Sequence, residues 1–229
     1  MPRRNLLGFL ALAAALAIPV AAQVPPTAAQ TAAYQGLHTA AARGDVAAVQ
    51  RLAAARADLN ARDPQGRTPL HVATFARQRE VIRALAQAGA QLDALENDRY
   101  DTVTIAAVAD DEATLRLLLA LGASAKQVTS RYDGTALIAA AHLGHEGVVR
   151  QLIAAGAPLD HVNNLHWTAL IESIVLGDGG PRHQATLAAL LQAGASAALT
   201  DRQGNTPLQL ARQRGHAEMV RMLEAAGAR

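Results

Sequence analysis

The sequence predicts an all-α solenoid, in which about six helix-turn-helix units joined by hairpins or turns stack around one continuous core. Three observations support this fold class. Apolar residues make up 51% of the chain but aromatic residues only 3%, so the apolar content is mostly alanine, leucine and valine. Alanine and leucine are strong helix formers. One short phrase also returns along the chain at nearly constant spacing, and glycines recur where the predicted helices should end.

The repeated phrase is clearest at residues 66–73, "GRTPLHVA", and at residues 204–211, "GNTPLQLA". Weaker copies are "DGTALIAAA" from Asp133 and "HWTALIESI" from His166, and an earlier copy, "QGLHTAAARGD", begins at Gln35. Hydroxyl or carboxyl residues at equivalent positions are spaced by 33, 34, 33 and 38 residues: Thr68, Asp101, Thr135, Thr168 and Thr206. A period of this length indicates a stack of repeated units.

Each copy predicts the same pair of helices. The hydroxyl or carboxyl residue precedes the first helix as an N-cap, where its oxygen accepts from free backbone N–H groups. Pro69 and Pro207 then stand at the first helical position, where a missing N–H costs nothing. Glycines suited to the left-handed C′ position follow the first helix (Gly44, Gly144, Gly177, Gly215) and the second helix (Gly89, Gly122, Gly156, Gly194, Gly227). Because neither helix can bury its apolar side alone, the pairs must stack.

This unit, with its Thr-Pro-Leu-His phrase and two helices, closely resembles the ankyrin repeat, and the resemblance covers nearly all of residues 34–229. The repeats are expected at residues 34–62, 63–95, 96–129, 130–162, 163–200 and 201–229, and are numbered one to six below. Arg56, Arg77 and Asp110 stand where the pattern has glycine. Arg56 fits a degenerate capping repeat, while the helix-to-helix turns at Arg77 and Asp110 should be slightly strained or differently shaped. The surplus residues 178–182, "DGGPR", predict a longer loop between the two helices of repeat five.

Residues 1–22 have the pattern of a secretory signal peptide. Arg3 and Arg4 precede an apolar stretch at residues 6–20, and small residues favour cleavage near Ala22. We therefore expect an exported, periplasmic protein. A membrane anchor is the alternative, but the stretch is shorter than the roughly 20 apolar residues that an anchor needs, and Pro19 interrupts its end. The paired arginines also resemble, loosely, a twin-arginine signal. Residues 23–33 carry two prolines and no periodicity, which predicts a flexible linker.

Composition excludes several classes of partner and chemistry. The chain has 21 Lys and Arg against 19 Asp and Glu, and removal of residues 1–22 leaves 19 against 19. Without a net positive charge or a basic run, neither nucleic acid nor a membrane surface is an expected partner of the mature chain. The absence of cysteine excludes disulfides and thiolate chemistry.

No motif predicts catalysis or a cofactor. The nucleophile elbow, the metalloprotease pattern and the dinucleotide fingerprint are all missing. Glu172 lies on an apolar helix and is expected to bond to a neighbouring repeat or to water. A metal hypothesis with His142, His166 and His183 stays open, but it requires three or four convergent ligands. The ankyrin resemblance implies structural hydrogen bonds, within and between repeats, for His38, His71, His145 and His216.

The resemblance also implies a mode of action, because partners of ankyrin repeats contact the hairpin tips and the exposed part of each first helix on the concave side. Carried onto this sequence, it predicts a non-catalytic, exported binding or scaffold protein. Large aromatic residues at these positions are typical interface anchors. Alternatively, the rings stiffen their hairpins, or a second copy docks there in a self-assembling or stress-protective protein, for example in peroxide defence. The predicted protein-binding residues are Arg67, Phe75, Tyr100, Tyr132, His142, Leu143, Asn164, His166, Trp167 and Val175.

Overall fold

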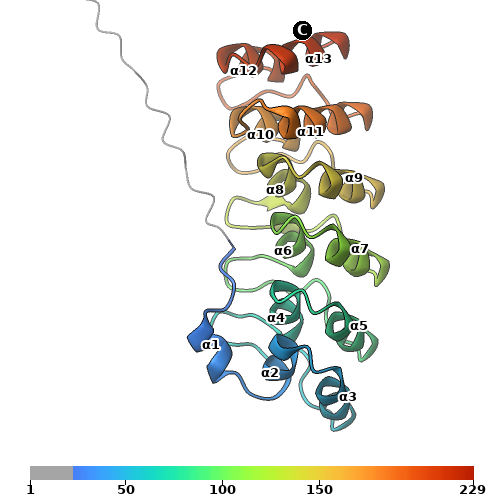
Figure 1. The fold of residues 1–229 in the computed structure, drawn as a ribbon. Helices are drawn as coiled ribbons and strands as arrows, with labels where there is room; N and C mark the ends of the chain where they lie inside the picture. The colour runs from blue at the N-terminus through green and yellow to red at the C-terminus, as the bar shows by residue number, and fades with distance from the viewer. Residues whose placement is uncertain (1–22) are drawn as a thin grey trace, which may run out of the picture.

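A computed structural model describes residues 23–229 as a single stack of helix pairs (Figure 1). The predicted signal peptide, residues 1–22, lies outside the described residues. The inner helices form one column and the outer helices a second (Figure 1), so the predicted all-α solenoid is confirmed. In chain order the pairs are α2 (Gly36–Arg43) and α3 (Val46–Ala54), α4 (Pro69–Phe75) and α5 (Arg79–Gln87), α6 (Thr102–Val108) and α7 (Glu112–Ala120), α8 (Ala136–Leu143) and α9 (Glu146–Ala154), α10 (Ala169–Val175) and α11 (Pro181–Gln192), α12 (Pro207–Gln213) and α13 (Ala217–Ala225).

Hairpins or turns connect the pairs on the inner side of the stack. One hairpin contains a regular ladder, in which β1 (Val128–Thr129) pairs antiparallel with β2 (Gly134–Thr135). Among residues 23–229, no helix has the length and apolar character needed to cross a membrane.

The caps fall where the sequence places them. The side chains of Thr68, Asp101, Thr135, Thr168 and Thr206 each accept a hydrogen bond from the backbone N–H of the third helical residue. Each therefore satisfies one of the N–H groups that the first turn leaves free. This fixes where every inner helix from α4 to α12 begins.

Buried leucines and inter-repeat hydrogen bonds join the pairs into one core. Leu70, Leu137 and Leu152 are fully buried in a cluster that extends from repeat one to repeat six. The Nε2 atom of His38 donates to the carbonyl of Arg67 at 2.9 Å, and that of His71 donates to the carbonyl of Tyr100 at 3.2 Å. These two histidines therefore tie each inner helix to the hairpin of the next repeat, as the ankyrin resemblance implies.

The three turns that lack glycine keep the left-handed backbone conformation. The φ angles are 59° at Arg56, 55° at Arg77 and 52° at Asp110. This conformation is unfavourable for residues with a Cβ. The strain expected from the sequence at Arg77 and Asp110 is therefore present, and Arg56 shares it, while the shape of each turn is preserved.

We expect Arg56→Gly to stabilise the protein by about 0.5–1 kcal/mol, because glycine adopts this backbone conformation without a Cβ clash. Urea unfolding followed by circular dichroism measures the change. Arg51→Gly is the matched control, since Arg51 is equally exposed but lies inside α3. There glycine should cost about 1 kcal/mol. A loss of stability in both variants would contradict this account of Arg56.

Two segments differ from the sequence prediction. Residues 28–33 of the predicted flexible linker form a helix, α1 (Ala28–Ala33), because Thr27 and Gln30 make a reciprocal capping box. The insertion in repeat five is only partly a loop. Pro181 occupies the first position of α11, which has 12 residues where the outer helices of other repeats have nine. Gly179, rather than Gly177, supplies the left-handed conformation in this loop, with a φ of 70°.

Candidate functional site

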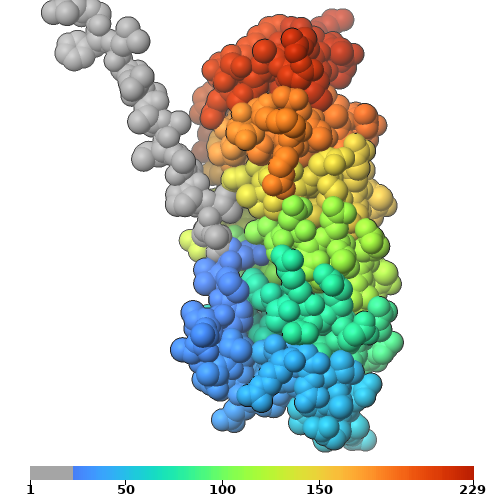
Figure 2. Space-filling view, in the orientation of Figure 1, coloured from blue at the N-terminus to red at the C-terminus, as the bar shows by residue number. Residues whose placement is uncertain are grey.

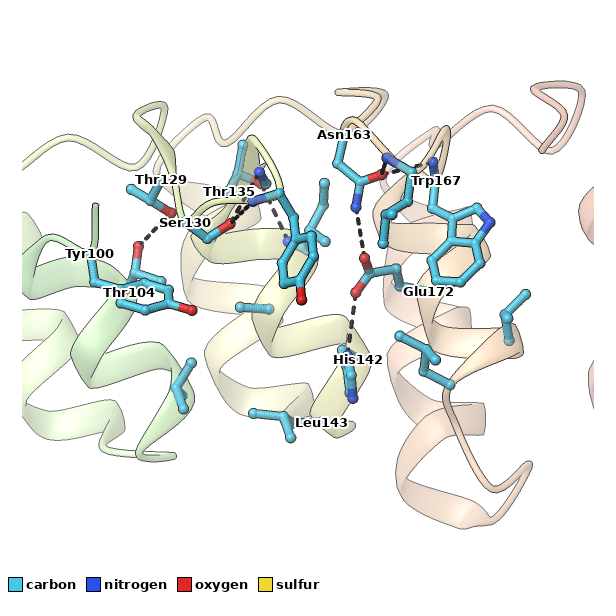
Figure 3. A pocket seen from close by; sticks show the side chains of 18 of the residues that line it. Tyr100, Thr104, Thr129, Ser130, Thr135, His142, Leu143, Asn163, Trp167 and Glu172 are labelled. Atoms are coloured by element: carbon cyan, nitrogen blue, oxygen red, sulfur yellow. Dashed lines mark hydrogen bonds and ion pairs between the residues drawn. The ribbon is translucent and has the colours of Figure 1, made fainter. Parts of the chain in front are cut away.

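A hollow of about 420 Å³ lies on the concave face and spans repeats three to six (Figure 3). Its walls come from the inner helices α6, α8 and α10 and from the hairpins that precede α8 and α10. Of the ten residues predicted to bind protein, six line it: Tyr100, Tyr132, His142, Leu143, Trp167 and Val175.

Three aromatic side chains from successive repeats line this hollow. Tyr100 and Trp167 lie on opposite sides of the close-up, with His142 and Glu172 between them (Figure 3). Tyr100 is buried, and burial raises the pKa of its phenol, with the nearby Asp98 carboxylate adding to the effect. Tyr132 and Trp167 are half-buried, and Trp167 packs partly against the core. The hollow therefore offers aromatic surface held in place by the stack.

A buried acidic side chain joins repeats four and five in the wall of the hollow. Glu172 is 6% exposed, and its Oε1 accepts from Nδ2 of Asn163 at 2.8 Å. Its Oε2 lies 3.4 Å from Nδ1 of His142 in the preceding repeat (Figure 3). The sequence-based expectation that Glu172 bonds to a neighbouring repeat is thus confirmed.

Asn163 links this pair to the hairpin beneath Trp167. Its Oδ1 accepts from the backbone N–H groups of Leu165 and Trp167, both at 3.0 Å. The amide oxygen of Asn163 therefore holds the turn, and its amide nitrogen holds the carboxylate of Glu172. Sequence reasoning missed Asn163, although a signal exists: Asp63 and Asp201 hold the equivalent turns in repeats two and six.

Arg67 is buried in this structure, whereas the sequence predicts an exposed binding residue at this position. Its side chain is 3% exposed and its Nε donates to Oδ2 of Asp63 at 2.7 Å. The hydroxyl of Tyr34 donates to the same carboxylate oxygen at 2.7 Å. Burial by itself raises the pKa of Asp63, but the hydrogen bonds from Tyr34 and Arg67 outweigh it and hold the pKa below its usual value. Arg67 is therefore half of a buried ion pair.

Asn164 and His166 lie on an exposed hairpin outside the hollow. His166 has a φ of 65° at the position where repeats two and six have Gly66 and Gly204. Asn164 connects neighbouring hairpins, because its Nδ2 donates to the carbonyl of Arg131 at 3.0 Å and its own carbonyl accepts from Arg202 at 2.8 Å. Val175 lines the hollow but is 6% exposed, so it contributes wall rather than contact surface.

Phe75 and Arg67 line a second hollow, of about 350 Å³, on the concave face of repeats two and three. Residues 23–34, here called the N-terminal arm, form part of its wall. The arm contributes Gln23, Val24, Thr27 and Gln30, and the stack contributes Pro64, Gln65, Glu96, Asn97, Asp98 and Tyr100 as well as Phe75 and Arg67.

The histidines of the metal hypothesis do not converge. His183 uses both ring nitrogens, Nδ1 with Asp178 at 2.8 Å and Nε2 with the carbonyl of His142 at 2.9 Å. Within residues 23–229, no group of three or more His, Asp or Glu side chains is placed to hold a metal ion. His142 and His183 instead connect neighbouring repeats, through Glu172 and through the carbonyl of His142 respectively.

Comparisons with known proteins agree with this architecture. The family description "Ankyrin repeats (3 copies)" matches residues 23–98 and 103–201, and "Ankyrin repeats (many copies)" matches residues 181–224. The putative ankyrin repeat protein YahD of Escherichia coli (strain K12) is 45% identical over 100 residues, which is 43% of this chain. The aligned part spans half the length of that relative.

Solved structures show the same arrangement. An ankyrin repeat domain from Acinetobacter baumannii AYE is 44% identical, with a TM-score of 0.79 over 84% of this chain and 98% of that one. The ankyrin repeat domain of Bcl-3, a member of the IkappaB protein family, is 28% identical, with a TM-score of 0.77 over 86% of this chain and 88% of that one. Together with the family matches over most of the sequence, these likenesses show that the chain belongs to the ankyrin-repeat family.

Proposed function

We propose that this chain is a non-catalytic binding protein whose concave hollow receives a segment of another protein. Ankyrin repeats generally act as protein-protein interaction modules. The observation that carries the proposal is the hollow itself, in which Tyr100, Tyr132 and Trp167 come from three successive repeats. Aromatic side chains are the usual anchors of interfaces, and a rigid stack that already positions them loses little entropy when a partner docks.

Affinity capture from the exported fraction tests this proposal, with residues 23–229 as bait beside Tyr132→Ala/Trp167→Ala. Loss of two aromatic anchors should weaken partner binding by about 1,000-fold if their effects add, because each anchor typically contributes about 2 kcal/mol. Leu143→Glu is a second variant, since Leu143 lines the hollow but is not part of the buried core. Val162→Ser is the matched control, because Val162 is 42% exposed and lies outside the hollow.

Melting temperatures separate the loss of an interface from the loss of the fold. The proposal predicts that Leu143→Glu melts close to the wild-type temperature yet fails to retain the partner. Equal capture by wild type and both hollow variants would refute it. A concentration-dependent dimer that disappears in Trp167→Ala would instead identify the occupant as a second copy of this chain.

We also propose that the protein works outside the cytoplasm, after removal of residues 1–22. The support is the sequence pattern at residues 3–22, with its paired arginines, apolar stretch and small residues. Intact mass and N-terminal sequencing of the protein recovered from the periplasm should show a chain that begins at Gln23. Recovery of the full chain from the cytoplasm alone would contradict export.

A further inference from the structure

The N-terminal arm folds back along the concave face instead of leading away from it. Figure 1 shows α1 beside α2, with the chain before it running past the hairpins of repeats two and three. The space-filling view shows the blue atoms of the arm reaching the green part of the stack (Figure 2). Gln23, at the start of the described chain, lines both hollows. The arm therefore lies between the second hollow and the aromatic hollow that carries the proposed function.

The stack binds the arm mainly at two points. The hydroxyl of Tyr34 donates to Asp63 at 2.7 Å, and Nη1 of Arg67 donates to the carbonyl of Val24 at 3.4 Å. The Asp63–Arg67 ion pair thus contacts the arm at both ends. Because Arg67 meets a backbone carbonyl, this contact does not depend on which side chain the arm carries there.

Two features make the arm easy to displace: its side chains are largely exposed, and one of its buried polar atoms is unpaired. Helix α1 buries no side chain, and Val24 is 68% exposed. The Nε2 atom of Gln23 is buried without a hydrogen-bond partner. A buried donor left without an acceptor is unfavourable. The arm therefore lines the same hollow as Arg67, Phe75 and Tyr100 and leaves one of its own buried donors unpaired.

We propose that the groove over repeats two and three is a peptide-binding site whose resident occupant is the N-terminal arm, and that a partner of the concave face replaces it with an extended, uncharged segment. This inference rests on the proposed function. The part of the arm that precedes α1 indicates the chemistry of that segment, because residues 23–27 lie outside any helix and contain two prolines and no charged side chain. Since the arm is tethered, it competes at a high effective concentration.

Energy transfer within the mature chain, residues 23–229, tests this directly. Trp167 is the only tryptophan and the chain has no cysteine, so Val24→Cys labelled with a dansyl group gives one donor and one acceptor. The probe ligand is a synthetic peptide with the sequence of residues 23–34, added in millimolar amounts. We expect the peptide to reduce the transfer from Trp167, as it displaces the labelled arm, while a scrambled peptide does not.

Two variants in the labelled chain sharpen the test. Tyr34→Phe removes the bond to Asp63 and should lower the peptide concentration needed for half-displacement by about fivefold. Thr31→Glu is the matched control, because Thr31 is exposed on α1, which buries no side chain, so the transfer should be unchanged.

Three results would overturn the inference: transfer that the peptide leaves unchanged in both wild type and Tyr34→Phe, equal loss with the scrambled peptide, or transfer that depends on protein concentration. The last would show that the arm docks on a second copy. None of these measurements uses the unknown partner. Displacement by the peptide combined with unaltered capture by Tyr132→Ala/Trp167→Ala would therefore reject the proposed function while leaving the arm site standing.

Discussion

Asp101→Thr is expected to stabilise the protein at about pH 7.5 by about 2–3 kcal/mol. Asp101 is 1% exposed, and burial raises its pKa to about 6, although hydrogen bonds from Thr104 oppose the increase. At this pH its carboxylate is charged in the folded chain, where the charge is poorly solvated. Threonine removes the charge and keeps the cap, as Thr68, Thr135, Thr168 and Thr206 do in other repeats.

The pH dependence of the free energy of unfolding tests the prediction for Asp101 more stringently. The raised pKa of Asp101 gives the folded state an extra proton between pH 3.8 and about 6, so its contribution is favourable at low pH and is lost as the pH rises. The contribution of His71 to stability changes with pH in the opposite direction. Burial lowers its pKa from 6.5 to about 4, so its contribution is present above pH 6.5 and is lost as the pH falls.

The two contributions oppose one another over nearly the same interval. We therefore expect these groups to leave wild-type stability nearly level between about pH 6.5 and 4.5, whereas Asp101→Thr should lose about 2–3 kcal/mol on acidification. Urea unfolding at both pH values measures the difference. His71→Gln in the Asp101→Thr background should remove the slope, and Gln209 shows that glutamine can complete this capping box. If the stability of Asp101→Thr depended on pH as that of the wild type does, this account of Asp101 and His71 would be refuted.

Asn163→Asp is expected to destabilise the protein by about 2–4 kcal/mol, although aspartate stands at the same position in repeats two and six. The carboxylate can still accept from Leu165 and Trp167, as Asp63 and Asp201 do in their own turns. It cannot donate to Glu172, however, and two buried carboxylates would then face one another where Nδ2 and Oε1 are now 2.8 Å apart.

A double-mutant cycle isolates this contact. Glu172→Gln removes the second charge, so Asn163→Asp/Glu172→Gln should recover most of the stability that Asn163→Asp loses, with a coupling of about 1–3 kcal/mol. Urea unfolding of the four proteins measures it. Asn60→Asp serves as a comparison and should change stability less, because Asn60 is half-exposed and its Oδ1 only accepts from the backbone N–H of Gln91, as a carboxylate also can. Additive effects of Asn163→Asp and Glu172→Gln would show that the two side chains do not interact.

The sequence predicts the architecture closely because its signals are local and repeated. Thr68 and Thr206 begin their helices with the oxygen contacts that capping chemistry requires. The repeat pattern also locates the three turns that lack glycine, since Arg56, Arg77 and Asp110 retain the left-handed backbone. The short helix of the arm was missed because prolines masked a capping box, Thr27 and Gln30, that is legible in the sequence.

The site was predicted less completely, because its decisive side-chain pairs are particular to single repeats and do not recur along the chain. Arg67 stands at a hairpin position and reads as exposed, but Asp63 and Tyr34 enclose it. Glu172 occupies a position where Val72, Ile105 and Leu210 are apolar, which marks it as unusual without naming His142 as its neighbour. Position within the repeat gives the face on which a residue lies, whereas its partners depend on the packing of two repeats.

Trp167 fluorescence, measured while the captured partner is titrated into residues 23–229, tests the central claim most directly. Trp167 is the only tryptophan and lines the concave hollow. Occupation of the hollow should shift its emission to shorter wavelength and protect it from acrylamide quenching, with Leu143→Glu abolishing both effects. Saturable binding of the partner with unchanged Trp167 emission and quenching would place the interface elsewhere and contradict the account.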